Sequence, residues 1–261
     1  MLVAIGSVKG SPGVTSLAVA LAARWPTPGA VVVEADPAGG DLAFRFGHHR
    51  EPGLSELAAD TRAGGVGRDL AAYTQPLTVG VDAVLAPAEP EAVPAVRLLA
   101  ARGVGLLRAA AINRLVAVDV GRLAWQSPAL PLAAAADVLL LVTRAWPDAV
   151  DAVQVRRDAL LALPGMRASV RLVLAGDVPC PAREVERVVG LPVAGRVPDD
   201  RRGAAVLSGR ARPGLGWTRL EFLRAARAVA TALHTEPVHR PAPAGAPVAP
   251  ARVAAEAVRR P

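Results

Sequence analysis

The chain has 261 residues, of which 52% are hydrophobic, so it can form one large domain or two small ones around a sizeable core. Thirty basic and twenty-three acidic residues give a formal net charge of +7, which suits an acidic partner but is not by itself a nucleic-acid signature. A single cysteine excludes an internal disulfide, and with only four scattered histidines it argues against a structural zinc site.

The apolar segments are too short for a membrane span. The longest apolar run covers residues 130–143, is interrupted by Asp137 and falls short of the ~20 residues that a spanning helix needs. Residues 1–5 lead directly into a glycine-rich turn and lack a basic leader, so they indicate a buried strand rather than a secretion signal. We therefore expect a cytoplasmic protein without a membrane span.

Short apolar runs alternate with helical patterns along the chain. In chain order the pattern predicts a strand at 2–7, a helix at about 15–24, strands at 30–34 and 78–86, a helix at about 90–107, strands at 115–119 and 138–143, a helix at about 148–162, strands at 170–174 and 193–196, and helices at about 201–208 and 219–233. The strand runs do not alternate with polar residues, which is typical of parallel strands buried on both faces.

The predicted fold class is therefore α/β: a doubly wound, mainly parallel sheet of about seven strands, with helices on both faces. Residues 1–234 form this domain. Residues 235–261 are dominated by proline and alanine without bulky apolar side chains, so we expect a disordered tail. A helix at 251–260 is conceivable, but its face of Ala and Val is too weak for an amphipathic membrane anchor.

The first predicted strand ends in a glycine-rich turn, and residues 7–16 read SVKGSPGVTS. Such a turn before a helix aims backbone N–H groups and the positive end of the helix dipole at one anion. The strict pattern G-x-x-x-x-G-K-[ST] is not met, because Val8 replaces its first glycine and Val14 its lysine, whereas Gly13 and Thr15 fit. Lys9 is the only lysine among thirty basic residues. Lysine is a compact cation, and a position close to phosphate can require it where arginine serves elsewhere. The alternatives are that Lys9 is a lysine by chance and that the turn is an ordinary strand–helix turn.

This turn resembles the loop of the ParA/MinD family of deviant phosphate-loop ATPases, K-G-G-x-G-K-[ST]. Residues 9–15 match that frame with Ser11 for the second glycine and Val14 for the second lysine. The resemblance implies that Lys9 is the signature lysine, which reaches the partner's phosphates in a nucleotide-sandwich dimer, and that Thr15 supplies a magnesium-binding hydroxyl. The implied nucleotide-binding residues of the loop are Gly10, Ser11, Pro12, Gly13, Val14, Thr15 and Ser16.

Segments at later strand ends resemble the same family. Residues 31–42, VVVEADPAGGDL, resemble its D-x-D-P segment, with Asp36 at the aspartate associated with the attacking water and Glu34 where a first aspartate is usual. A turn capped by Asp36 before Pro37 is the alternative. Residues 84–87, VLAP, resemble the family's L-P-A-P. The run 115–119, LVAVD, resembles a Walker-B strand whose Asp119 would hold Mg²⁺ through water.

Residues 191–200, LPVAGRVPDD, resemble the family's late strand with P-x-D, so Pro198 and Asp200 would border the adenine. Two departures stand out: Asp119 is followed by VGR rather than the usual x-P-x-G, and no asparagine follows the preceding strand. Within the family, the sequence is similar to the CpaE/TadZ-like variants beside pilus-assembly and secretion machinery, where degenerate loops occur.

The missing loop lysine bears on activity. Losing a charged hydrogen bond of ~1.5–3 kcal/mol corresponds to roughly 10- to 150-fold in affinity or rate. The resemblance implies a homodimerising switch that uses ATP and Mg²⁺, acts with the protein partners of a positioning or assembly system, and has weak or no ATPase activity. The alternatives are a scaffold that binds no nucleotide and a DNA-partitioning ATPase. DNA is not favoured, because its candidate residues suit a solvated face equally well: Arg201, Arg202, Arg210 and Arg212.

Overall fold

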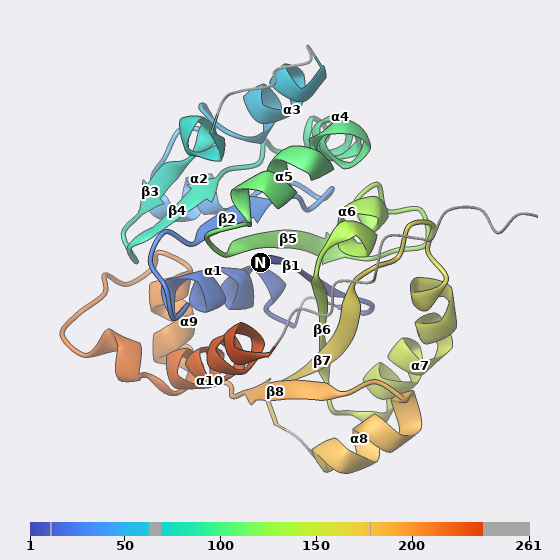
Figure 1. Cartoon of the computed structure of the whole chain (residues 1–261). Coiled ribbons are helices and arrows are strands. Elements are labelled where there is room, and N and C mark those ends of the chain that lie inside the picture. Colours follow the sequence, from blue (N-terminus) through green and yellow to red (C-terminus); the bar gives the residue numbers. More distant parts are fainter. Residues whose placement is uncertain (11, 63–68, 178, 237–261) are drawn as a thin grey trace, which may run out of the picture.

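A computed structural model describes residues 1–10, 12–62, 69–177 and 179–236. Ser11 of the predicted phosphate loop and residues 237–261 of the predicted tail lie outside the described residues. The sheet within the described part has eight strands in the order β3-β4-β2-β5-β1-β6-β7-β8 (Figure 1). The strands are β1 (Leu2–Ser7), β2 (Val31–Glu34), β3 (Gln75–Leu77), β4 (Val81–Val84), β5 (Val116–Arg122), β6 (Val138–Arg144), β7 (Ser169–Ala175) and β8 (Val193–Val197).

Every pairing in this sheet is parallel except that of β3 with β4. The helices are α1 (Val14–Ala23), α2 (Leu42–Phe46), α3 (Leu54–Arg62), α4 (Ala92–Leu98), α5 (Val104–Ala110), α6 (Leu130–Ala135), α7 (Pro147–Leu161), α8 (Ala182–Val189), α9 (Arg201–Leu207) and α10 (Glu221–Thr235). The predicted doubly wound α/β class is confirmed.

Two apolar clusters cover the two faces of the sheet. One joins α1, α2, α9 and α10 to side chains such as Ile5 of β1 and Leu140 of β6. The other joins α3 to α8 to the opposite face, including Ala4 of β1 and Leu141 of β6. Consecutive residues of each central strand thus belong to different clusters, because successive side chains of a strand point to opposite faces of the sheet. Figure 1 shows α1, α9 and α10 together on one side of the strands, and α4, α5 and α6 on the other.

The region predicted as one strand at 78–86 differs in the structure. It holds a turn and then β4, which begins only at Val81, and the short β3 lies just before it. Gly80, at a φ of 74°, donates its N–H to the Leu77 carbonyl and closes the hairpin. The antiparallel β3 adds an eighth strand that the apolar pattern did not predict. The region predicted as a helix at 90–107 holds α4 and α5, with a π-helical turn at Leu99–Gly103 between them.

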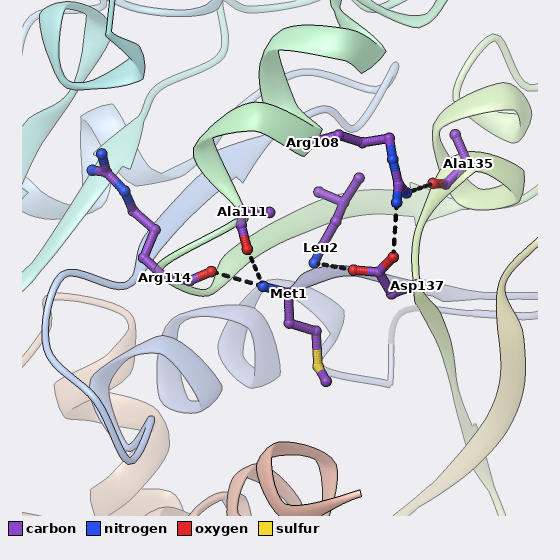
Figure 2. Close-up of polar contacts among 7 residues, drawn as sticks. All are labelled: Met1, Leu2, Arg108, Ala111, Arg114, Ala135 and Asp137. Atoms are coloured by element: carbon purple, nitrogen blue, oxygen red, sulfur yellow. Dashed lines mark hydrogen bonds and ion pairs between the residues drawn. The ribbon is translucent and has the colours of Figure 1, made fainter. Parts of the chain in front are cut away.

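Polar contacts fasten the amino edge of the sheet, where the parallel strands begin (Figure 2). The Met1 amine donates to the carbonyls of Ala111 and Arg114. One oxygen of Asp137 accepts from the Leu2 N–H at 2.8 Å, and the other pairs with Arg108 at 3.2 Å. Asp137, which interrupts the longest apolar run, therefore joins β1 to α5. Among the described residues, no helix is long and apolar enough to cross a membrane.

Candidate functional site

The turn between β1 and α1 lies at the carboxyl edge of the sheet, where the parallel strands end. Gly10 and Gly13 adopt left-handed backbone conformations, with φ of 72° and 92°, which favour glycine. A Cβ at either position would meet nothing within 4 Å, so the turn is open above both glycines. Helix α1 begins after Gly13 without a side-chain cap and without an acidic residue in its first turn. Its first N–H groups and its dipole thus remain available to an anion.

Asp119 lies at the floor of this site. It is 1% exposed on β5, in register with Ile5 of β1 and Glu34 of β2. Burial raises the pKa of Asp119 to about 6, while a hydrogen bond with the Thr15 side chain and one from the Gly121 N–H, at 3.0 Å, oppose the rise. The structure therefore brings together the two residues predicted to hold magnesium.

Asp36 approaches the same floor from the end of β2. Its carboxyl lies directly against Gly121, because a Cβ built on that glycine would come within 2.1 Å of the Asp36 Cγ. The Ala38 N–H donates to Asp36 Oδ1 at 2.9 Å. Burial is the largest cause of the raised pKa of Asp36, and the charges of Asp41 and Glu89 add to it. Asp36 thus forms the capped turn considered from the sequence and also faces the Asp119 strand end.

Glu34 ties the β2 end to its surroundings. Its Oε1 accepts from the N–H groups of Asp41 and Leu42, both at 3.0 Å, and its Oε2 accepts from Ala86 at 3.1 Å. Burial raises the pKa of Glu34 to about 7 despite these three hydrogen bonds. Gly40 is required beside it, since a Cβ there would lie 2.6 Å from Glu34 Oε2. Glu34 is therefore a brace for the loop that carries Asp36.

Replacing Gly121 with alanine should destabilise the protein by roughly 1–3 kcal/mol, because the new methyl group overlaps the Asp36 carboxyl and φ is +57°. The matched control is Gly105→Ala in α5, where a Cβ meets nothing within 4 Å. It should stabilise by about 0.4–1 kcal/mol. Urea unfolding measures both. Equal free energies of unfolding for wild type and Gly121→Ala would contradict a fixed Asp36 carboxyl.

Two loop positions that bear on charge, Val14 and Lys9, differ in their surroundings. Val14 is only 7% exposed and packs in the apolar cluster of α1, α2, α9 and α10. The Lys9 ammonium lies 2.8 Å from Asp148 Oδ2 at the start of α7, and both side chains are exposed. Asp148 was not predicted from the sequence, since it is 139 residues away from Lys9.

Asp200, which was predicted to border the adenine, has a structural role in the fold. Asp200 caps α9 by accepting from the Gly203 N–H at 2.9 Å, and its other oxygen accepts from Phe222 at 3.1 Å. Both carboxylate oxygens of Asp200 thus join α9 to α10. Pro198 is half-buried just after β8, and Ser16 is half-buried in the first turn of α1. These positions lie at the carboxyl edge of the sheet, but no described polar contact joins them to Thr15.

The residues present suit a magnesium–nucleotide group. Mg²⁺ keeps several waters and needs only one or two protein oxygens besides the phosphates, which Thr15 and Asp119 offer. In the part of the chain that the structure describes, no group of three or more His, Cys, Asp or Glu side chains could hold a metal ion. The open glycine turn and the uncapped helix suit a phosphate group, but the loop cation Lys9 pairs with Asp148 and Val14 is apolar.

A glycine turn before an uncapped helix, flanked by carboxylates at adjoining strand ends of a doubly wound sheet, is typical of phosphate-loop NTPases. No family model matches the sequence, and no curated protein matches it. Solved structures do match. A ParA family ATPase from Chlorobium tepidum has 19% identity and a TM-score of 0.67, covering 89% of this chain and 98% of that one.

Two MinD structures match similarly. The MinC:MinD complex of Aquifex aeolicus has 15% identity and a TM-score of 0.66, covering 90% of this chain and 96% of that one. MinD complexed with Mg-ADP from Pyrococcus horikoshii has 18% identity and a TM-score of 0.65, with coverage of 90% and 96%. This chain therefore has the fold of the ParA/MinD ATPases.

Proposed function

We propose that this protein is a ParA/MinD-like nucleotide-dependent switch that dimerises on Mg-ATP, positions other cellular machinery in the cytoplasm, and hydrolyses ATP slowly or not at all. The observation that carries the proposal is the open turn at Gly10 and Gly13 above the Thr15–Asp119 contact. The fold neighbours support it, since one MinD structure holds Mg-ADP and another is a complex with MinC.

The impaired hydrolysis follows from charge. Phosphoryl transfer depends mainly on positioning and on stabilising the developing charge, so the absence of a loop lysine at Val14 should slow hydrolysis more than it weakens binding. Asp36 and Asp119 remain in place, which supports retained binding of a magnesium nucleotide. Lys9 would have to leave Asp148 to act on the phosphates of a partner subunit.

Titration of the purified full chain tests the proposal. Calorimetry with Mg-ATP and Mg-ADP measures binding, and light scattering measures mass in the same solutions. Binding accompanied by a doubling of mass is the expected result. Absence of binding to either nucleotide would overturn the switch and favour the scaffold alternative.

DNA binding stays an alternative because four arginines are exposed on α9 and the loop after it: Arg201, Arg202, Arg210 and Arg212. Phosphate contacts release counterions, so retention on DNA through these residues would fall steeply as salt rises. Retention that is absent at low salt would exclude this alternative.

Binding of Mg-ATP should weaken as the pH falls below about 6. Because burial raises the pKa of Asp119 to about 6, its carboxylate becomes protonated there, rather than near the usual pH of about 4. Competition with one proton reduces affinity by up to about tenfold per pH unit below the pKa. Calorimetry between pH 5 and pH 8 provides the measurement.

The control for this titration is Asp119→Asn, which cannot be protonated at that position and reports the titration of the ligand and of the remaining carboxyls, Glu34 and Asp36. The two proteins should differ in slope below pH 6. Parallel pH profiles would contradict a role for Asp119 in holding the metal.

A further inference from the structure

Among the described residues, the candidate site holds carboxylates, and the only cation of its loop, Lys9, is paired with Asp148. Asp119 and Asp36 converge beside Gly121, Val14 is apolar, and the Lys9 ammonium contacts Asp148 at the start of α7. A triphosphate with its metal needs positive charge from the protein as well. Among the described residues, a cation on a fixed element near the site would meet this need.

Arg45 lies on such an element. Its helix, α2, starts where the N–H groups of Asp41 and Leu42 donate to Glu34, and Glu34 is in register with Asp119 on the neighbouring strand. Arg45 Nη2 lies 2.6 Å from Asp41 Oδ2, one helical turn away. The anchored start of α2 thus holds the Arg45–Asp41 pair near the β5 end.

The packing of α2 fixes Arg45 from its other side. Leu42 and Ala43 are buried in the same apolar cluster as Val14. The backbone carbonyl of Arg45 contacts Gly209, where a Cβ would lie only 2.0 Å from it. The helix that carries Arg45 therefore packs in the same layer as the first turn of α1.

Electrostatics separate Arg45 from the other basic residue near Asp119. The Arg45 charge lowers the pKa of Asp119, and the charge of its partner Asp41 raises that of Asp36. Arg122 follows Asp119 on β5, but its charge acts on Arg156 of α7. The Arg45 charge therefore acts on Asp119, whereas the Arg122 charge acts on Arg156.

We propose that Arg45 is a phosphate-binding residue that supplies, within the same subunit, the positive charge absent from the loop at Val14. The inference rests on the proposed nucleotide binding. A guanidinium has five N–H donors, so Arg45 can keep Asp41 and present its remaining donors to a phosphate oxygen. Thr15 and Asp119 would hold the metal beside the phosphates, and an arginine on the Asp119 side would contact the terminal phosphate, which ATP has and ADP lacks.

The test compares wild type, Arg45→Ala and Arg45→Lys by calorimetry with Mg-ATP and Mg-ADP. Arg45→Ala should weaken Mg-ATP binding by about tenfold or more, the loss of a charged hydrogen bond, and leave Mg-ADP binding unchanged. Arg45→Lys should restore part of the affinity, because it keeps the charge without the planar fork.

Arg114→Ala is the matched control. Arg114 pairs with Asp69 before β5, at the amino edge of the sheet, and side-chain exposures of 28% and 61% match the 30% and 67% of Arg45 and Asp41. It should bind both nucleotides like wild type. Urea unfolding of all the variants, without nucleotide, separates a binding effect from a loss of stability.

The outcomes are distinguishable. Wild-type binding that Arg45→Ala leaves unchanged overturns the role of Arg45 and spares the proposed function. Equal loss of Mg-ATP and Mg-ADP binding, together with a lower free energy of unfolding, also overturns it and assigns Arg45 to the stability of α2. If wild type binds neither nucleotide, the proposed function and the Arg45 inference are both wrong.

Discussion

Val14→Lys should tighten the binding of Mg-ATP by roughly 10- to 150-fold, because a restored charged hydrogen bond contributes ~1.5–3 kcal/mol. The Val14 side chain is buried, but a lysine has a long apolar stem that can follow the cluster while its ammonium emerges at the open glycine turn. Overpacking of the cluster should cost about 1–3 kcal/mol of stability. Turnover should rise as well, since Asp36 and Asp119 are already at the site.

Calorimetry and phosphate release measure these two effects, and Val14→Met is the control, because it lengthens the side chain without adding charge. Val14→Met should show a stability cost without tighter binding. Equal affinities of Val14→Lys and wild type would contradict an ammonium that faces the phosphates.

Combining Val14→Lys with Arg45→Ala tests whether the two cations act on the same group. Contacts to one phosphate are coupled, so their effects on binding should not add, whereas effects of distant, independent sites do. The loss caused by Arg45→Ala should be smaller in the Val14→Lys background than in wild type. Strict additivity would place the two side chains on different parts of the ligand.

The strands of the core could be predicted because each is a continuous apolar run, and the order of these runs indicates a parallel sheet. The edge strand β3 could not, since Gln75-Pro76-Leu77 is short and its apolar pattern merges with that of β4. The five-residue α2 is likewise shorter than the periodicity needed to recognise a helix.

The candidate site was predictable where its residues follow strand ends, as Asp36 and Asp119 do. The remaining contacts depend on the order of strands in the sheet. Glu34 lies beside Asp119 only because β2 and β5 are neighbours, and this places Arg45 near the site. The i,i+4 spacing of Asp41 and Arg45 is visible in the sequence, but it indicates only an ordinary helical ion pair. The contact between Asp148 and Lys9 could not be predicted either, because 139 residues separate them in the sequence.

Lys9→Ala should abolish nucleotide-induced dimerisation and leave the fold intact. Lys9 contributes one exposed ion pair with Asp148 and no core contact, so its removal changes stability little. In the proposed dimer its ammonium reaches the partner's phosphates, so nucleotide binding and dimerisation favour each other by the same free energy. Light scattering of wild type and Lys9→Ala, each with and without Mg-ATP, measures the loss.

Two further variants sharpen this experiment. Lys9→Arg should rescue dimerisation only in part, because a planar fork does not fit where a point charge does. Asp148→Asn should release Lys9 from its contact in the single chain and favour the dimer at lower Mg-ATP concentrations, whereas a purely structural Lys9–Asp148 pair predicts that Asp148→Asn behaves like Lys9→Ala. Identical masses in all solutions, with calorimetry showing bound nucleotide, would contradict a lysine that acts across the interface. The positive charge that neutralises the phosphates would then have to come from the same subunit.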